Sequence, residues 1–148
     1  MAFLLLAMLF LHANLNAQSQ PDSVECAKEG ERCQFNGTSA VSYGTDANRI
    51  SKTVTGGIDC NNRAFGSDPA PGVAKTCKLV PTKCADEGGI CAFSGKRTVK
   101  YGAIGIWTET IATNGIKCAN GEIGKDPVPN VSKQCFLTHT PARRLQII

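Results

Sequence analysis

Short runs of alternating apolar and polar residues recur along the chain, and most of them end at a glycine. The runs "CQFNG", "AVSYG", "CAFSG" and "TVKYG" alternate in this way, and "RISKTVTG" and "WTETIATNG" are rich in β-branched residues. Such runs, separated by turns at intervals of roughly 8–10 residues, are typical of antiparallel strands. No stretch carries an amphipathic helical stripe, so the pattern predicts an all-β fold.

The whole pattern occurs twice. When the sequence is shifted by 58 residues, every cysteine of the first half falls on a cysteine of the second, and residues 26–79 and 84–137 are identical at 23 of 54 positions without a gap. Such a repeat marks one structural unit. We therefore expect two tandem modules, residues 26–79 and 84–137, joined by a short linker at residues 80–83. Each should be a small antiparallel β-sandwich or barrel-like sheet that disulfides stabilise, because its core is small.

The residues that both copies share indicate which positions matter to the module. The apolar and aromatic pairs are core candidates: Phe35/Phe93, Val41/Val99, Tyr43/Tyr101, Ile58/Ile116 and Val73/Val131. The shared polar pairs are Glu29/Glu87, Thr55/Thr113, Asn62/Asn120, Asp68/Asp126 and Lys75/Lys133. Several of these lie in "GSDPAPGVAKTC" and its copy "GKDPVPNVSKQC", which is either a duplicated binding loop or a duplicated closing segment of the framework. The prolines and the terminal cysteine favour the closing segment.

The first 17 residues, "MAFLLLAMLFLHANLNA", form a largely apolar run without Lys, Arg, Asp or Glu. Its apolar stretch, Phe3 to Leu11, is too short to span a bilayer, and the small residue Ala17 stands at a plausible cleavage point, as in secretory signal peptides. The alternative is a buried N-terminal helix. The sequence therefore predicts a secreted, extracellular protein without membrane insertion, in which an extension at residues 18–25 precedes the modules and a tail at residues 138–148 follows them.

Eight cysteines in a secreted chain predict a disulfide framework. No CxxC occurs, and the histidines are His12 in the leader and His139 in the tail, so neither a metal site nor another cofactor is expected. Four cysteines per module allow three pairings. We expect the nested pattern, Cys26–Cys77 with Cys33–Cys60 and Cys84–Cys135 with Cys91–Cys118, which would pin both ends of each module. Sequential pairing, with Cys26 bound to Cys33, is the open alternative.

The signature "CADEGGICAFSGKRTVKYGA", followed by "NGIKC" and "GKDPVPNVSKQC", resembles a short four-cysteine module of secreted proteins that is often appended to microbial polysaccharide-degrading enzymes. The likeness extends over both copies. The second copy fits better, because the first has Glu31 and Arg32 where the second has Gly89 and Ile90. Such modules are held to bind carbohydrate, so the resemblance implies a carbohydrate-binding, lectin-like role and supplies no catalytic activity.

The composition argues against catalysis and against nucleic-acid binding. With His139 as the one histidine after the leader, a Ser-His-Asp or Cys-His site is nearly excluded. The shared acids Glu29/Asp68 and Glu87/Asp126 belong to modules too small to form a glycosidase cleft. The net charge of +4 is small and evenly divided between the copies, which offers no footprint for nucleic acid. We therefore expect a protein that is not an enzyme.

Sugar-binding surfaces place an exposed aromatic ring beside amides and carboxylates. The candidates for such a surface are Tyr43, Tyr101, Trp107, Asn62, Asn120, Asp68 and Asp126. Most have a structural interpretation as well, because the tyrosines alternate with valines and the Asn and Asp residues fall in expected turns. Trp107 has no aromatic counterpart, since Arg49 occupies the matching position. The cluster Lys96, Arg97 and Lys100 is typical of solvated surface charge and would also suit an anionic glycan.

Two N-x-S/T sequons, at Asn36 and Asn130, predict N-glycosylation in a eukaryotic host. The sequence favours a secreted, non-enzymatic tandem-repeat glycoprotein whose partner is a polysaccharide or glycoconjugate. One alternative is a structural protein of an extracellular matrix, cement or mineralised tissue, associated with matrix polymers. The other is a cysteine-rich inhibitor or defence protein that presents the segment 44–55 as an exposed loop.

Overall fold

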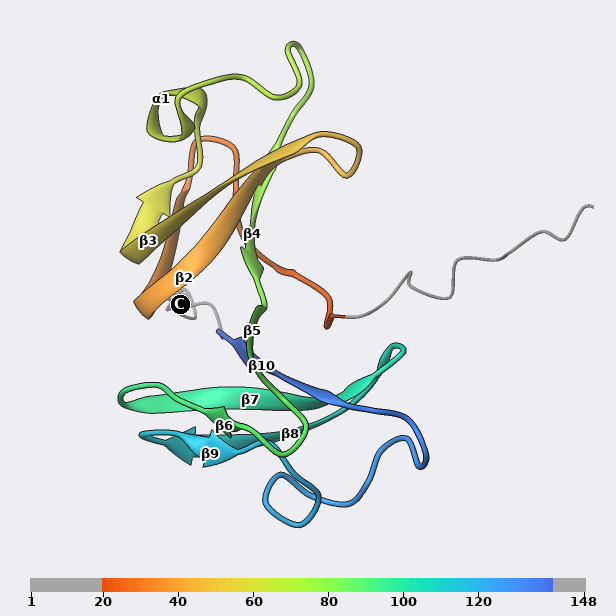
Figure 1. Ribbon diagram of the computed structural model, residues 1–148. Helices are drawn as coiled ribbons and strands as arrows, with labels where there is room; N and C mark the ends of the chain where they lie inside the picture. The colour runs from red at the N-terminus through yellow and green to blue at the C-terminus, as the bar shows by residue number, and fades with distance from the viewer. Residues whose placement is uncertain (1–19, 140–148) are drawn as a thin grey trace, which may run out of the picture.

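The computed structural model describes residues 20–139, which form two four-stranded antiparallel sheets, one from each copy of the repeat (Figure 1). The first sheet contains β1 (Val24–Lys28), β2 (Arg32–Gly44), β3 (Arg49–Asp59) and β4 (Thr76–Val80), in the order β1-β4-β2-β3. The second contains β5 (Thr82–Asp86), β7 (Lys96–Ala103), β8 (Ile106–Thr113) and β10 (Gln134–Thr138), in the equivalent order β5-β10-β7-β8. A short ribbon pairs β6 (Ile90–Cys91) with β9 (Ile116–Lys117). The prediction of an all-β, antiparallel fold is confirmed.

The central hairpin has the same register in both copies. Tyr43 pairs with Ile50 across β2 and β3, and Tyr101 pairs with Thr108 across β7 and β8. The register of β2 then shifts, and in the second copy this break separates β6 from β7. Beyond the shift the paired backbones approach closely at Gly57, where a Cβ atom would lie 2.6 Å from a carbonyl oxygen of the partner strand. Glycine is therefore required at this position, and its copy Gly115 has a positive φ of 103°, which also favours glycine.

The segment 44–55, considered above as an exposed inhibitory loop, is mostly strand. Gly44 pairs with Arg49, so the loop proper is four residues long, and Thr55 pairs with Thr38. The remainder of the segment is hydrogen-bonded to β2 along its length. A loop that protrudes from the fold and could enter a protease is therefore not present at this position.

One short helix, α1 (Asn62–Phe65), is the only helix among residues 20–139. Asn61 caps it by accepting a hydrogen bond from the Ala64 amide at 2.8 Å, and Gly66 ends it in the left-handed conformation with a φ of 90°. Four residues make a single turn, which carries no repeating apolar stripe. The sequence pattern therefore gave no indication of it.

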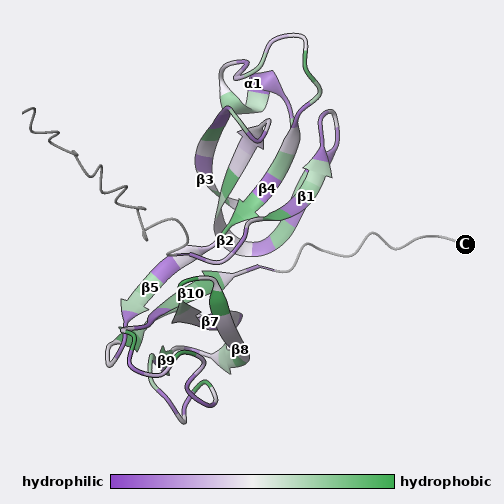
Figure 2. Cartoon of the chain, turned by 90° about the vertical axis from the view of Figure 1, so that its right-hand side faces the viewer, coloured by the Kyte–Doolittle hydropathy of each residue, from purple (hydrophilic) through white to green (hydrophobic). Residues whose placement is uncertain are grey.

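Each sheet buries its own apolar cluster, as the alternation of hydrophobic and hydrophilic residues along the strands requires (Figure 2). Tyr43, Val41, Tyr101 and Val99 are fully buried, which confirms that both tyrosines pack inward. Phe35 and Ile58 are buried as predicted, and their copies Phe93 and Ile116 are partly buried. Four of the five shared apolar pairs thus belong to the cores, and the pair Val73/Val131 does not.

Val73 is an exception: the prediction that it enters the core is wrong, because the residue is 53% exposed. The chain turns back here, with the Val73 amide donating to the Ala70 carbonyl oxygen at 3.2 Å. The Val73 carbonyl oxygen accepts a hydrogen bond from the Lys75 ammonium at 2.8 Å. This turn buries Ala70 in place of Val73, and in the second copy it buries Val128.

The disulfides are sequential, so the nested pairing predicted above is wrong. Cys26 binds Cys33 and Cys60 binds Cys77; the second copy repeats this with Cys84–Cys91 and Cys118–Cys135. The sheet order explains the difference, because β4 lies between β1 and β2 and pairs Cys77 with Ala27, not with Cys26. A tight turn after β1 brings Cys26 and Cys33 to a Cα–Cα distance of 5.1 Å.

The expected linker at residues 80–83 is shorter in the structure. Val80 ends β4 and Thr82 begins β5, so Pro81 alone separates the two sheets, and its side chain is buried. The predicted signal peptide, residues 1–17, lies outside the described residues, as does the tail beyond His139. No helix within residues 20–139 is long and apolar enough to cross a membrane. Four disulfides are typical of extracellular or secreted proteins.

Candidate functional site

Five of the polar and aromatic residues that both copies share come together in one cluster per copy, which we call the cage. In the first copy the cage consists of Glu29, Tyr43, Asn62, Asp68 and Lys75. The Tyr43 hydroxyl lies 2.6 Å from Glu29 Oε1 and 2.7 Å from Asn62 Oδ1, and it donates its single proton to one of them. The Asn62 amide nitrogen donates to Asp68 Oδ2 at 3.0 Å. Lys75 Nζ lies 3.2 Å from a carboxylate oxygen of each acid.

The second copy reproduces the cage with Glu87, Tyr101, Asn120, Asp126 and Lys133. The Tyr101 hydroxyl lies 2.6 Å from Glu87 Oε1 and 2.9 Å from Asn120 Oδ1. Lys133 Nζ lies 3.2 Å from Glu87 Oε1 and 3.2 Å from Asp126 Oδ1. Lys75 and Lys133 are each 4% exposed and also donate to backbone carbonyl oxygens of the turn before the last strand. Each cage therefore ties the closing segment of its copy to the core tyrosine.

The charges of the cage are fixed by their mutual contacts. Burial acts to lower the pKa of Lys75, but the hydrogen bonds and charges of Glu29 and Asp68 outweigh it and raise the pKa. The hydrogen bonds from Tyr43 and Lys75 lower the pKa of Glu29 against the opposing effect of burial. Burial, together with the Glu29 charge, raises the pKa of Tyr43. The second copy shows the same directions. A neutral tyrosine, an ammonium and two carboxylates satisfy one another, and no group is poised to exchange protons near pH 7.

The cage changes the interpretation of six sequence candidates. The rings of Tyr43 and Tyr101 are fully buried, so neither offers a platform for a sugar. Asn62, Asn120, Asp68 and Asp126 direct polar atoms at cage partners. The repeated polar residues thus build the framework, and Trp107 remains as the aromatic candidate for a binding surface.

Trp107 lies on the outer face of the second sheet, opposite Gly102 of β7. Because Gly102 has no side chain, nothing from β7 covers the ring. The ring is half-buried and packs edge-on against Phe136 of β10, with ring centroids 5.5 Å apart. The same face continues along the hairpin with the pair Lys100 and Glu109, whose charged atoms are 3.9 Å apart, and then with Ile111. An aromatic ring, one cation and one carboxylate therefore share one face of the second sheet.

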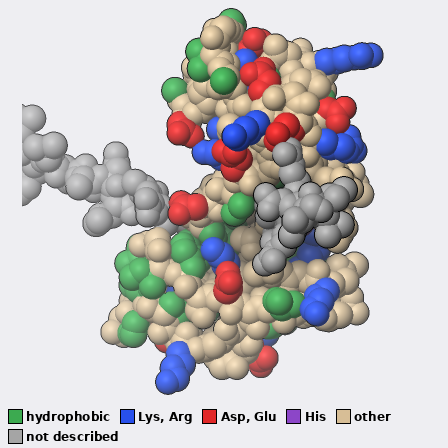
Figure 3. All heavy atoms as spheres, turned by 180° about the vertical axis from the view of Figure 1, so that it is seen from behind, with side chains coloured by type: hydrophobic (Ala, Val, Ile, Leu, Met, Phe, Trp, Pro, Cys, Tyr) green, Lys and Arg blue, Asp and Glu red, His purple; other side chains and the backbone are tan. Residues whose placement is uncertain are grey.

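The equivalent face of the first sheet has a different chemistry. Arg49 occupies the position of Trp107, and it donates to the Ser42 hydroxyl at 3.1 Å and to the Thr76 carbonyl oxygen at 2.6 Å. Lys78 occupies the position of Phe136 and forms an ion pair with Asp46 at 2.8 Å. Figure 3 shows charged side chains across the middle of the first copy, and hydrophobic side chains gathered on one side of the second. The two faces are not equivalent surfaces.

A groove of about 530 Å³ lies between the two sheets and runs along the outer face of the second. The second sheet provides its polar side with Thr98, Lys100, Glu109, Thr110, Thr138 and His139, together with Ile111. The other side comes from Asp22 before β1, Val24 at the start of β1, Leu79 in β4 and Pro81 at the junction. Hydroxyl, carboxylate and ammonium groups thus line the groove together with apolar side chains. This composition suits a polar ligand that also has hydrophobic faces.

His139 lines this groove, although the sequence placed it in the tail that follows the second module. Its ring packs against Phe35 of the first copy at a centroid distance of 5.6 Å, and its Nδ1 lies 2.9 Å from Arg97 Nη1. Burial and the Arg97 charge lower the pKa of His139, so the ring is neutral at pH 7. Arg97 also donates to the Asn36 carbonyl oxygen at 3.2 Å. These contacts join the two copies beside the groove.

The groove was not apparent from the sequence. Asp22, Leu79, Glu109 and His139 are far apart in the chain and belong to no motif. The sequence did contain one indication of this surface, which is a difference between the copies. Arg49, Ser51 and Thr53 of the first copy are replaced by Trp107, Glu109 and Ile111 in the second. Differences between the copies, more than identities, mark the candidate site.

The predicted sequon residues Asn36 and Asn130 are both exposed. Among residues 20–139, no group of three or more His, Cys, Asp or Glu residues is arranged to hold a metal ion. All eight cysteines of the chain are engaged in disulfides and offer no thiolate.

No family model matches the chain, and no solved structure matches it significantly.

Proposed function

We propose that this chain is a secreted, non-enzymatic protein that binds carbohydrate in the groove between its two sheets, with Trp107 as the aromatic platform. The observation that carries the proposal is the outer face of the second sheet, where the half-buried indole ring of Trp107 lies on the same face as Lys100 and Glu109, which line the groove. Sugar rings present apolar faces rimmed by hydroxyls, and such a surface complements both.

The proposal places one composite site on the molecule. Two equivalent sites would require the shared residues to face the ligand, and these residues build the cages. The groove takes lining residues from both copies and from the junction at Pro81, so one copy alone would lack half of it. The duplication therefore supplies a second wall for one site, and binding does not depend on avidity between two sites.

The test is a glycan-array screen of the folded chain, followed by pull-down on insoluble polysaccharides. Trp107→Ala should weaken binding at least about tenfold, since an aromatic contact contributes on the order of 1.5 kcal/mol. Glu109→Gln and Ile111→Ala should also weaken it. Their matched controls are Ser51→Ala and Thr53→Ala, the equivalent positions of the first sheet, which should leave the affinity unchanged.

Two results would contradict the proposal or the location of its site. If the folded chain binds no glycan and is retained in an insoluble matrix fraction, the proposal is wrong and a structural role takes its place. If glycan binding occurs but the first-sheet and second-sheet variants weaken it equally, the site is not the groove.

A further inference from the structure

The groove continues into a smaller pocket of about 320 Å³ at the contact between the two copies. Thr98, Ile111, Thr138 and His139 line both spaces, and the smaller pocket adds Asn36, Lys96 and Arg97. No Asp or Glu lines it, whereas the groove contains both Asp22 and Glu109. The lining of this end of the composite site therefore contains two cationic side chains and no carboxylate.

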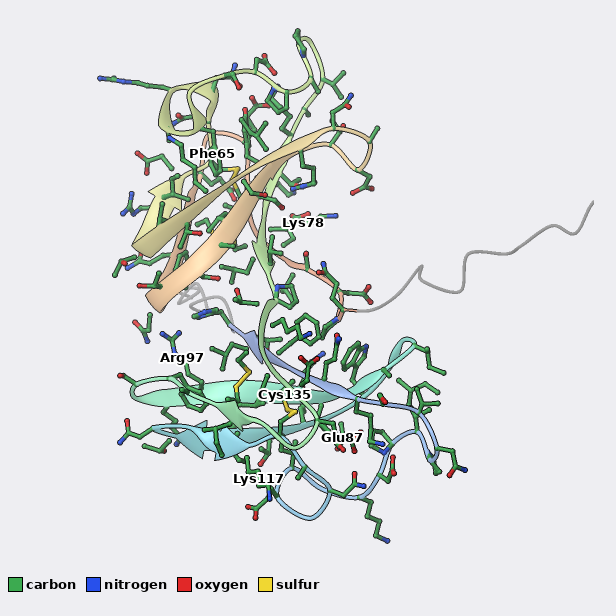
Figure 4. The ribbon with its side chains drawn as sticks, viewed as in Figure 1. Phe65, Lys78, Glu87, Arg97, Lys117 and Cys135 are labelled. Atoms are coloured by element: carbon green, nitrogen blue, oxygen red, sulfur yellow. A yellow bond between two sulfur atoms is a disulfide. The ribbon has the colours of Figure 1, made fainter. Side chains whose placement is uncertain are left out.

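The groups that position Arg97 are neutral and do not compensate its positive charge. Its guanidinium, half-buried between the sheets (Figure 4), donates to the Asn36 carbonyl oxygen and contacts the neutral His139 ring. The guanidinium lies directly against Gly37, where a Cβ atom would collide with it. The absence of a side chain at Gly37 therefore leaves room for Arg97. Within the described part of the chain, neither Lys96 nor Arg97 forms an ion pair with a carboxylate.

Arg49, the other partly buried arginine among residues 20–139, has a carboxylate nearby, although its buried Nη1 forms no hydrogen bond. Arg49 has Asp46 at 3.9 Å. The positions of Lys96 and Arg97 are Thr38 and Ser39 in the first copy, so the repeat does not require two cations there. A positioned arginine without a counter-ion is suited to binding an anion, because its planar guanidinium donates two parallel hydrogen bonds to a carboxylate or sulfate.

We propose that this pocket binds the anionic group of an acidic sugar, the carboxylate of a uronate or a sulfate ester, while the neighbouring part of the same polysaccharide lies in the groove. The inference rests on the proposed function and narrows it to acidic polysaccharides. Arg97 pairs with the anion from the junction between the copies, and Lys96 adds a second charge from the start of β7. His139 forms the shared wall of the two spaces.

The test compares matched polymers by titration calorimetry at low and at physiological salt. A polyuronate and its carboxyl-reduced form make one pair, and a sulfated glycan and its desulfated form make the other. The acidic member should bind about tenfold more tightly in at least one pair, and salt should reduce the difference because the charges are partly exposed. Which pair shows it identifies the carboxylate or the sulfate as the ligand.

The variants separate the pocket from the groove. Lys96→Gln, at an exposed residue, should reduce the preference for acidic polymer and leave binding of the neutral member unchanged. Arg97→Lys, which keeps the charge but loses the paired donors, should also reduce the preference for acidic polymer. Lys117→Gln and Lys125→Gln, exposed cations that line neither space, are the controls and should change nothing. Circular dichroism confirms that each variant is folded.

Three outcomes overturn the inference. In the first, the acidic and the neutral polymer bind with equal affinity and Trp107→Ala loses binding of both. The proposed function then stands, and the inference that the pocket binds an anion is wrong. A preference for acidic polymer that survives Lys96→Gln and Arg97→Lys also removes the pocket. If polyglutamate binds as tightly as the acidic polysaccharide, the preference reflects non-specific electrostatic attraction and the inference is wrong. Binding of no polymer at all overturns the proposed function itself.

Discussion

The Tyr101 hydroxyl lies 2.6 Å from a carboxylate oxygen of Glu87, and its counterpart Tyr43 meets Glu29 at the same distance in the other copy. Each tyrosine ring is fully buried in its core, and each glutamate also accepts a hydrogen bond from the backbone amide of the cage lysine. One hydroxyl thus connects the core to the segment that closes the module. This relationship makes the cage a structural element whose removal is measurable.

Tyr43→Phe and Tyr101→Phe should each destabilise the fold by about 1.5 kcal/mol, because each removes a hydrogen bond to a carboxylate that is partly exposed and keeps its lysine partner. Urea unfolding under non-reducing conditions measures the loss. The double variant should show nearly the sum, since the two cages have no residue in common. Glycan binding by the folded variants should be unchanged. Loss of binding with unchanged stability would show that the tyrosines serve a ligand and not the framework.

Acid should weaken the cages. The pKa values of Glu29 and Glu87 lie below the ordinary 4.5, and those of Asp68 and Asp126 lie below 3.8. The unfolded chain therefore binds more protons than the folded one at low pH, and stability falls as pH decreases below about 5. The double variant Glu29→Gln/Glu87→Gln should be less stable at pH 7 and lose less stability between pH 6 and pH 3.

The control for this pH series is Glu122→Gln, at an exposed acid outside the cage. Thermal melting at several pH values should give it the slope of the native chain. If the double glutamine variant keeps the full acid dependence, the cage carboxylates are not the groups responsible for it.

The disulfide pairing can be mapped with trypsin. Cleavage after Lys83 and Lys96 yields one peptide that contains both Cys84 and Cys91, so the sequential pairing predicts an internal bridge that lowers its mass by two hydrogens. In the first copy, the peptide from Thr53 to Arg63 should remain joined to the short peptide that contains Cys77. A peptide that joins Cys26 to Cys77 would instead restore the nested pattern.

The sequence predicted the strands and the cores well, because alternation and a 58-residue repeat constrain both. All five cage residues are among the positions that both copies share, but the sequence did not group them or reveal their role, since Asp68 and Asn62 have the same side chains whether they bind a ligand or each other. The disulfide pairing depended on β4 lying between β1 and β2, a long-range fact that cysteine spacing does not contain. The groove depends on how the sheets meet at Pro81, and no local pattern encodes that.

The turn between β7 and β8 offers a test of local strain. Ile104 and Gly105 form a two-residue turn in which both have positive φ, 46° and 82°. A β-branched residue in the left-handed region costs about 1 kcal/mol or more, and Ile104 is 56% exposed, so little packing offsets the cost. Asn-Gly is the preferred sequence of such turns. Ile104→Asn should therefore raise the unfolding free energy by about 1 kcal/mol.

The matched control is Ile106→Asn, two residues further on in β8, where the side chain is 51% exposed. Asn is disfavoured in strands, so this variant should be neutral or slightly destabilised. Urea titration of both variants distinguishes relief of backbone strain from loss of an exposed apolar side chain, because only the first depends on the position within the turn. If both variants gain stability equally, removal of surface hydrophobicity explains the gain and the turn is not strained. If Ile104→Asn loses stability, the isoleucine makes contacts that outweigh its unfavourable φ.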